Sequence, residues 1–194
     1  MRMTLTPYER KRNFKKTPEP SSKPKSGRQR APSQKRRRPL AFVVQKHRAS
    51  QLHYDFRLEV RGVLKSWAVP KGPSMNPADR RLAIQVEDHP FEYKDFEGAI
   101  PPGNYGAGQV IVWDAGTYTP GMRGDNPETV MMHGIHRGSL RFELKGAKLR
   151  GVFTLVRFRQ PDQWLLTKVN DRHATHERVV EDDASVISQR RLEG

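Results

Sequence analysis

The sequence predicts an all-β fold, an antiparallel β-barrel of about eight short strands preceded by a disordered basic N-terminal arm. Two observations favour it: apolar runs and apolar–polar alternations recur from residue 40 onward, and turns rich in Gly and Pro separate them. Helical periodicity is weak, and we expect at most a short helical turn at 76–80. Barrel closure would also let polar residues line one strand face while the other face packs.

The clearest pattern lies in the first expected strands. Apolar and polar residues alternate strictly over residues 52–60, and an Arg-Gly pair then makes a tight turn. Because successive side chains of a strand point to opposite faces, His53, Asp55 and Arg57 form one row above an apolar underside. The three strands expected here are 41–46, 53–60 and 63–69.

The later expected strands follow at short intervals, with turns such as the Lys-Gly-Ala-Lys segment at 145–148 between them. This spacing of short strands is typical of an antiparallel barrel or sandwich. These strands are expected at residues 81–87, 109–114, 116–119, 139–144, 149–157 and 164–169.

Basic residues are concentrated near the N-terminus. Residues 1–40 hold 14 of the 36 Lys and Arg residues and 2 of the 21 acidic residues, a net charge of +12, whereas the rest of the chain has a net charge of +3. Such an arm on a nearly neutral domain indicates a polyanionic partner, most simply nucleic acid. It would bind phosphates without sequence preference, although basic arms also serve as solubilising or targeting segments.

Composition and aromatic content divide the chain into segments. Tyr8 and Phe14 are the only aromatic residues before the barrel, whereas Pro, Ser and basic residues dominate the stretch that follows them. Val179, Val180 and Val186 could anchor part of the C-terminal end. The expected segments are an N-terminal segment docked on the barrel (1–19), a disordered basic linker (20–39), the barrel domain (40–170) and a polar C-terminal segment (171–194).

The composition also limits location and chemistry. The sequence contains no recognisable signal peptide or membrane span, and we expect a cytoplasmic protein associated with the nucleoid. Cys is absent, which excludes a disulfide framework and thiolate metal ligands. Any metal must therefore be held by His, Asp, Glu or Gln.

The polar row of the second strand has the parts of a metal-assisted phosphoester site. His47 could fold back toward this row across a polar turn, so that His47 and His53 would be two neutral metal ligands and Asp55 an anionic one. The planar guanidinium group of Arg57 can donate two hydrogen bonds to phosphate oxygens. For this row alone, a solvated edge strand is the simpler interpretation. Residues 81–89, however, repeat the pattern, because apolar Leu82, Ile84 and Val86 alternate with Gln85, Glu87 and His89 on the other face. An all-β domain has few places where polar side chains converge.

Other motifs are less specific. Lys71 lies in a loop stiffened by Pro and Gly and could contact phosphate, although most loop lysines are solvated. The run at 103–108 lacks the Lys-Ser/Thr pair and the helix of a phosphate loop, so turn chemistry explains it. Two histidine pairs in expected loop or tail surroundings have no third ligand and are not assigned a metal: His133 with His136, and His173 with His176.

Several strings match one known family. They are QKH at 45–47, LHYDFRLE at 52–59, KSWAVPKGP at 65–73, VEDHP at 86–90 with Tyr93, and FEG at 96–98 with GNYGAG at 103–108. Together they resemble the signature of the 3′-phosphoesterase domain of bacterial ligase D. The resemblance runs from about Tyr8 to about Asp171, and the chain has no room for polymerase or ligase modules, so we expect a stand-alone version.

The resemblance implies a Mn²⁺-dependent β-barrel enzyme that heals DNA 3′ ends in repair by end joining. It would remove a terminal 3′-ribonucleoside from primer–template DNA and hydrolyse the remaining 3′-phosphate, beside a repair polymerase or ligase. By position, the metal ligands correspond to His47, His53 and Asp55. The groups around the scissile phosphate correspond to Arg57, His89 and Tyr93, and the groups that support the site correspond to Glu87, Lys71 and Arg81. Arg12 and Glu19, in the N-terminal segment, correspond to further functional positions of the family. Whether His89 contacts the phosphate or protonates the leaving oxygen stays open.

One departure from the family's motifs stands out. Where the family has Lys-Arg-Asp-Phe, this chain has Lys-Arg-Asn-Phe, with Asn13 in place of Asp. Asn keeps the size and one acceptor oxygen but loses the charge. The resemblance ties this Arg-Asp pair to removal of the terminal ribonucleoside more than to hydrolysis of a 3′-phosphate. We therefore predict that 3′-phosphate hydrolysis is retained while removal of a terminal ribonucleoside is weak.

Two other functions stay open on the sequence. A non-catalytic DNA-end-binding protein with this fold would bind DNA without metal-dependent turnover, but the complete set of expected ligands argues against it. A phosphoesterase acting on RNA ends or cyclic phosphates would use the same residues. The basic arm favours a polymer over a small molecule.

Overall fold

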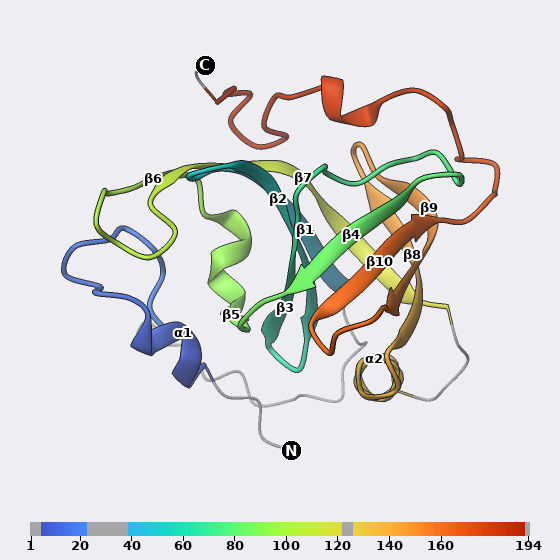
Figure 1. Ribbon diagram of the computed structural model, residues 1–194, viewed down its shortest axis with the longest axis horizontal. Helices are drawn as coiled ribbons and strands as arrows, with labels where there is room; N and C mark the ends of the chain where they lie inside the picture. The colour runs from blue at the N-terminus through green and yellow to red at the C-terminus, as the bar shows by residue number, and fades with distance from the viewer. Residues whose placement is uncertain (1–4, 23–38, 122–125, 193–194) are drawn as a thin grey trace.

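Eight antiparallel strands close into a barrel in the computed structural model, which describes residues 5–22, 39–121 and 126–192 (Figure 1). The predicted all-β barrel is therefore confirmed, whereas most of the expected disordered linker, residues 23–38, lies outside the described residues. In order around the ring, the strands are β1 (Leu40–Arg48), β2 (Leu52–Val60), β3 (Val63–Val69), β4 (Arg80–Gln85), β10 (Gln163–Lys168), β9 (Arg150–Arg157), β8 (Ser139–Gly146) and β7 (Gly108–Pro120), which pairs again with β1.

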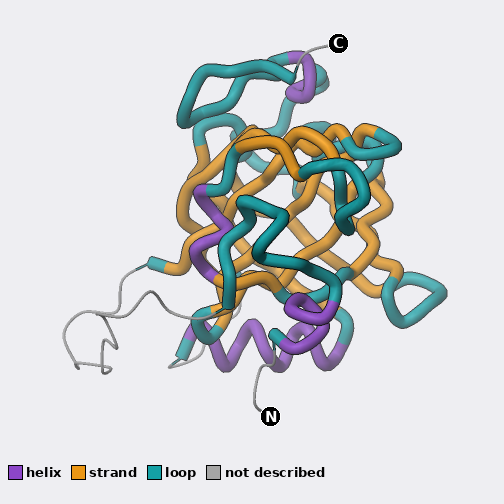
Figure 2. The backbone as a smooth tube through the Cα atoms, turned by 90° about the vertical axis from the view of Figure 1, so that its left-hand side faces the viewer, coloured by secondary structure: helices purple, strands orange, loops and turns teal. Residues whose placement is uncertain are grey.

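Shorter elements surround the ring. Strand β5 (His89–Pro90) pairs with β3, and β6 (Gly98–Ile100) pairs with β7. Figures 1 and 2 show the helices α1 and α2 at one end of the barrel and the C-terminal segment across the other end. The helical elements are α1 (Thr6–Arg10), the 3₁₀ turn η1 (Phe91–Asp95), α2 (Pro127–Arg137) and the 3₁₀ turn η2 (Val179–Glu181).

Two hydrophobic clusters stabilise the fold. The larger one fills the barrel interior and includes Phe42 and Phe56, together with three fully buried tryptophans, Trp67, Trp113 and Trp164. The smaller cluster lies on the outer face of β1 and β7, where Val43 packs with side chains of η1 and of the N-terminal segment. Its buried members are Tyr8, Val43, Leu64, Tyr93, Phe96, Ile100, Val110 and Val112. Apolar residues on both faces of β1 explain its continuous apolar run.

The helix α2 corrects the prediction of at most a short helical turn. Asn126 caps it by accepting a hydrogen bond from the backbone N–H of Glu128 at 3.0 Å, and Gly138 ends it with a φ of 80°. Met131 is buried in the barrel core. Capping and this packing stabilise a helix whose apolar stripe is weak in the sequence. His133 and His136 therefore lie on a helix, not in a loop.

Two strand predictions need correction. The expected strands 109–114 and 116–119 are one strand, β7, with an irregularity opposite Val44 and Gln45. Strand β4 ends at Gln85, and its inward face is the reverse of the one predicted, because Ala83 is buried and Leu82 is 39% exposed. The alternation predicted for β4 was short, so tertiary packing and not the pattern determines which face of the strand points to the core.

The C-terminal segment lies against the barrel. Trp113 Nε1 donates a hydrogen bond to the carbonyl of Asp182 at 2.6 Å, and Val179 and Val180 pack on the main core. The backbone of Val186 donates to Val112 at 2.9 Å. Among the described residues, no helix has both the length and the apolar character needed to cross a bilayer.

Candidate active site

The expected metal ligands come from one hairpin. His47 of β1 lies directly opposite His53 of β2, and Asp55 lies two residues further along the same face of β2. The other face carries Tyr54 and Phe56, which pack into the barrel interior. The alternation therefore directs all three polar side chains to the outer face of the barrel wall.

These three side chains are close enough to share one ion. Their ligand atoms lie within 4.8 Å of one another, with His47 Nδ1 at 3.6 Å and His53 Nε2 at 3.8 Å from the carboxylate oxygens of Asp55. The remaining ring nitrogens donate to backbone carbonyls, His47 Nε2 to Gly106 at 2.9 Å and His53 Nδ1 to Gln51 at 3.0 Å. This arrangement selects tautomers that turn an unprotonated nitrogen of each ring toward Asp55. Two imidazoles and a carboxylate suit a divalent cation such as Mn²⁺.

Asp55 is a carboxylate at any working pH. Burial raises the pKa of its carboxyl group, but the positive charge of Arg57 outweighs burial and holds the pKa well below its usual range. Arg57 Nη2 lies 3.1 Å from Asp55 Oδ2. An anionic ligand is thus maintained next to a fixed positive charge.

Arg57 is held rigidly by side chains that the sequence alone did not assign. Its Nε donates to Gln45 Oε1 at 2.7 Å and its Nη1 to Ser66 Oγ at 2.8 Å. Gln45 in turn donates to the carbonyls of Tyr93 and Phe96. Gln45 lies two residues before His47 on the same strand face, so the strand period could have identified it, whereas Ser66 is revealed only by the register of β3 against β2.

The N-terminal segment completes the site from the other side. Arg12 donates to Glu19 at 2.8 Å and to Glu87 at 3.1 Å, and its Nη2 lies 3.2 Å from His89 Nε2. The hydroxyl of Tyr93 donates to the same oxygen of Glu19 at 2.9 Å. Residues that are far apart in the sequence thus form one hydrogen-bonded network.

The environment determines the charge states in this network. Burial and the charges of Arg57 and Arg12 hold the pKa of His89 well below its usual range, so the ring is neutral at neutral pH. His89 Nδ1 lies 2.9 Å from the carbonyl of Glu87, to which it donates, and Nε2 is left to accept from Arg12. Burial also raises the pKa of Tyr93 well above its usual range, so its phenol stays protonated.

Lys11 and Tyr105 form the outer rim of the site. Lys11 Nζ donates to Glu87 at 3.0 Å and to the hydroxyl of Tyr105 at 3.2 Å. Burial raises the pKa of Glu87, but the hydrogen bonds from Lys11 and Arg12 outweigh it and lower the pKa. The cavity between these groups has a volume of about 260 Å³ and is lined by Arg12, His47, Ala49, His53, Asp55, Arg57, Ala68, Val86, Glu87, His89, Tyr93, Ile100, Tyr105 and Gly106.

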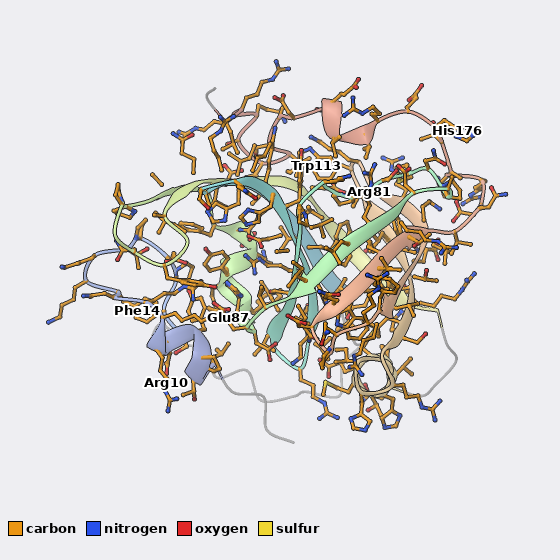
Figure 3. All side chains as sticks on the ribbon, viewed as in Figure 1. Arg10, Phe14, Arg81, Glu87, Trp113 and His176 are labelled. Atoms are coloured by element: carbon orange, nitrogen blue, oxygen red, sulfur yellow. The ribbon has the colours of Figure 1, made fainter. Side chains whose placement is uncertain are left out.

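Two of the expected residues lie elsewhere. Lys71 and Arg81 line a second cavity, also of about 260 Å³, beneath the C-terminal segment. Figure 3 shows the separation, with Arg81 near His176 at one end of β4 and Glu87 beyond the other end, beside the N-terminal segment. Arg81 Nη2 donates to Asp79 at 2.7 Å, and its buried Nε has no hydrogen-bond partner among the described residues. Gln85 likewise faces the barrel interior, where it accepts from Trp164.

Comparison with known proteins places the chain in a family. The family model of the DNA ligase D 3′-phosphoesterase domain matches residues 45–157, more than half of the chain. The chain belongs to this family. The residues matched to the DNA ligase D 3′-phosphoesterase domain include His47, all of β2, His89 and Tyr93, whereas Arg12 and Glu19 lie before them.

Curated relatives extend the similarity of this 3′-phosphoesterase domain beyond the matched segment. The chain is 49% identical over 97% of its length to the multifunctional non-homologous end joining protein LigD of Pseudomonas aeruginosa. It is 44% identical over 87% of its length to the multifunctional non-homologous end joining DNA repair protein LigD of Mycobacterium tuberculosis, and 40% identical over 87% to LigD of Mycolicibacterium smegmatis. The chain spans only 22%, 20% and 21% of the lengths of these three relatives.

Proposed function

We propose that this protein is a metal-dependent phosphoesterase that hydrolyses 3′-phosphates at DNA ends and so prepares them for end joining. The observation that carries the proposal is the group of His47, His53 and Asp55, with oriented tautomers, beside an arginine fixed by three side chains. The relatives, whose names place them in non-homologous end joining, support DNA ends as the substrate.

The three hairpin ligands would hold the metal, for which we propose Mn²⁺. When bound, a divalent cation would supply Lewis-acid stabilisation of a phosphate oxygen and a nucleophilic water at neutral pH. The protein residues do the rest. Arg57 is positioned before the substrate arrives, so it stabilises negative charge at the phosphate without reorganising.

His89 and its neighbours position a second cation. Because His89 is neutral and its Nε2 accepts from Arg12, it has no proton at that nitrogen to give to a leaving oxygen. We therefore propose that His89, Glu19 and Tyr93 orient Arg12 toward the phosphate. Glu87 would act in the same way through its contacts with Arg12 and Lys11.

Binding to DNA would involve surfaces outside this cavity. The basic residues of 20–39 are proposed to contact the backbone of the duplex. Lys71 and Arg81 are proposed to support phosphate binding from the second cavity. We also propose that the protein works in the cytoplasm, on nucleoid DNA, together with a repair polymerase or ligase, because its relatives are end-joining proteins.

The test uses a labelled primer–template that ends in either a 3′-phosphate or one 3′-ribonucleotide. With Mn²⁺, the 3′-phosphate should be converted to a 3′-hydroxyl, and a chelator should abolish the conversion. DNA binding without turnover in any divalent metal would instead support an end-binding accessory protein. Turnover confined to RNA ends or to cyclic phosphates would support a phosphoesterase with another substrate.

A further inference from the structure

The rim of the candidate active site presents an aromatic ring to solvent. Tyr105 is 48% exposed, whereas the other tyrosine that lines the cavity, Tyr93, is 2% exposed. Tyr93 is accounted for by its packing and its hydrogen bond to Glu19. Packing does not account for the outward position of Tyr105.

The loop that carries Tyr105 is ordered by its own hydrogen bonds. The backbone N–H of Asn104 donates to the carbonyl of Pro101 at 3.3 Å, and that of Ala107 donates to Asn104 at 3.1 Å. The side chain of Asn104 donates to Pro101 as well. The residue that follows Tyr105, Gly106, accepts from His47 Nε2 at 2.9 Å. The ring is therefore held one residue away from the group that orients an expected metal ligand.

Two cations lie beside the ring of Tyr105. Lys11 Nζ is 4.4 Å from the ring centroid, and the guanidinium carbon of Arg12 is 5.5 Å from it. Arg12 itself reaches His89 at 3.2 Å. The ring thus lies beside Arg12, which is proposed to bind the scissile phosphate.

Arg12 and Tyr105 line the same cavity, so a phosphate bound by Arg12 would place the nucleoside joined to it within reach of the ring. Exposed aromatic rings beside cations are how proteins bind unpaired nucleotides, because every base has a flat face that can stack whatever its sequence. We propose that Tyr105 stacks on the base of the nucleotide that carries the scissile 3′-phosphate, an inference that rests on the proposed function. The enzyme would then recognise the presence of a terminal base but not its identity.

The first test measures stacking without turnover. A DNA primer–template with 2-aminopurine as its 3′-terminal base and a 3′-phosphate is titrated with protein in the presence of a chelator. Stacking on the tyrosine should quench the fluorescence of 2-aminopurine. Tyr105→Phe should retain the quenching, because the ring remains, whereas Tyr105→Ala should lose it. Phe158→Ala is the matched control, since Phe158 is 38% exposed and also lies beneath an arginine; it should behave as the parental protein.

The second test uses kinetics. On 3′-phosphate ends with a normal base, Tyr105→Ala should lower kcat/KM about tenfold, mainly through KM, which is the size expected when one base–aromatic stack is removed. On ends whose terminal nucleotide lacks a base, the parental and Tyr105→Ala proteins should be equal. Lys11→Met tests whether Tyr105 acts by stacking or only by holding Lys11, because this variant removes the ammonium group and keeps the ring of Tyr105.

The outcomes separate the two proposals. Quenching that survives in Tyr105→Ala, or an equal loss of activity on ends with and without a base, would overturn the stacking role. A loss in Lys11→Met equal to that in Tyr105→Ala, on ends with a base, would show that the tyrosine acts only through Lys11 and would also overturn it. Tyrosine-dependent quenching in a protein that hydrolyses no 3′-phosphate would leave stacking in place and refute the proposed function.

Discussion

At the residue scale, backbone contacts distinguish the histidines of the candidate site from the others in the chain. In His47 and in His53, one ring nitrogen donates a hydrogen bond to a backbone carbonyl of a neighbouring loop. The other ring nitrogen of each faces Asp55. Among the described residues, this is the only group of three or more His, Asp or Glu side chains whose ligand atoms converge in this way. Preorganised donors of this kind lose little entropy when an ion binds.

Removing one of the three ligands should abolish turnover. His53→Ala leaves two ligands, and because a bound metal supplies several kcal/mol of transition-state stabilisation, we expect kcat to fall by a factor of about 100 or more at any Mn²⁺ concentration. His133→Ala, at an exposed position of α2 outside both cavities, is the control and should retain parental activity. Near-parental turnover of His53→Ala would show that the ion binds elsewhere.

The buried neutral state of His89 predicts a pH-dependent stability. Its folded pKa is held well below the unfolded value of 6.5, by burial first and then by Arg57 and Arg12. Below pH 6.5 the unfolded state therefore binds more protons, so the stabilisation present above pH 6.5 is lost as the pH falls. The loss attributable to this residue is at most about 1.4 kcal/mol per pH unit.

Chemical denaturation between pH 7 and pH 5 measures this effect. His89→Gln should be less stable than the parental protein at pH 7 but should lose less stability on acidification. His176→Gln, which changes an exposed histidine, should follow the parental curve. Parallel curves for the parental and His89→Gln proteins would contradict a depressed pKa at His89.

Asn13 provides a prediction about the reaction profile. Its Oδ1 accepts from the backbone of Lys15 at 3.1 Å, and neighbouring Arg12 already binds the two carboxylates Glu19 and Glu87. A charge at residue 13 is thus not needed to orient Arg12. We expect the parental protein to hydrolyse 3′-phosphates but to remove terminal ribonucleosides weakly, and Asn13→Asp to improve only the second reaction. Efficient ribonucleoside removal by the parental protein, with no gain in Asn13→Asp, would separate residue 13 from that step.

At the element scale, the strands predicted best are those whose alternation is long. The pattern over residues 52–60 predicted which side chains of β2 face the core, because one register alone buries Tyr54 and Phe56. The pattern at β4 was shorter, and packing of Ala83 and Trp164 in the core reversed its faces. The helix α2 was missed because its stability comes from caps and from Met131 packing against the barrel, features that periodicity does not reveal.

The site could be predicted only in part for the same reason. The two-residue period of a strand is enough to predict that residues such as His53 and Asp55 lie on the same strand face. Ser66 and Lys11 enter through the strand register and through docking of the N-terminal segment, and neither follows from local sequence. The family resemblance supplied Arg12 and Glu19, which no periodicity would have placed beside the barrel.

The β1–β7 seam beside His47 makes a prediction at this scale. Gly108 has a φ of 146°, and a Cβ there would lie 2.0 Å from the carbonyl oxygen of Arg48. Gly108→Ala must therefore push β1 and β7 apart next to His47, an expected metal ligand. We expect it to lower the free energy of unfolding by several kcal/mol, well beyond an ordinary Gly-to-Ala turn penalty of about 1 kcal/mol.

Gly62→Ala is the matched control for this seam. Gly62 also has a positive φ, 78°, but a Cβ there would have no atom within 4 Å. Chemical denaturation should show a small loss for Gly62→Ala and a large one for Gly108→Ala, and Mn²⁺-dependent turnover should fall only in the second. Equal losses in stability would mean that the seam adapts without strain.

At the scale of the whole molecule, charge and chemistry are placed in different parts of the chain. The barrel and its C-terminal segment are nearly neutral, and the cations of the cavity are mostly paired with carboxylates, such as Arg57 with Asp55 and Arg12 with Glu19. The segment 21–39 contains eight basic residues and no acidic residue. Affinity for a polyanion should thus depend on the segment, and the chemical step on the cavity.

Two variants separate these contributions. In the first, Arg57→Ala removes one fixed cation from the cavity, so the chemical step should slow by a factor of about 100 or more while DNA affinity changes little. In the second, Ser replaces all eight basic residues of 21–39, which keeps the length of the chain and leaves residues 5–22 tethered. Each phosphate that the segment no longer neutralises should reduce the slope of log K against log salt by about 0.9 on duplex DNA.

Binding titrations at several salt concentrations and single-turnover kinetics at saturating protein measure the two effects. Because saturation compensates for weak binding, the second variant should react at nearly the parental single-turnover rate. Parallel losses of binding and of single-turnover rate in both variants would mean that the segment and the cavity act as one site.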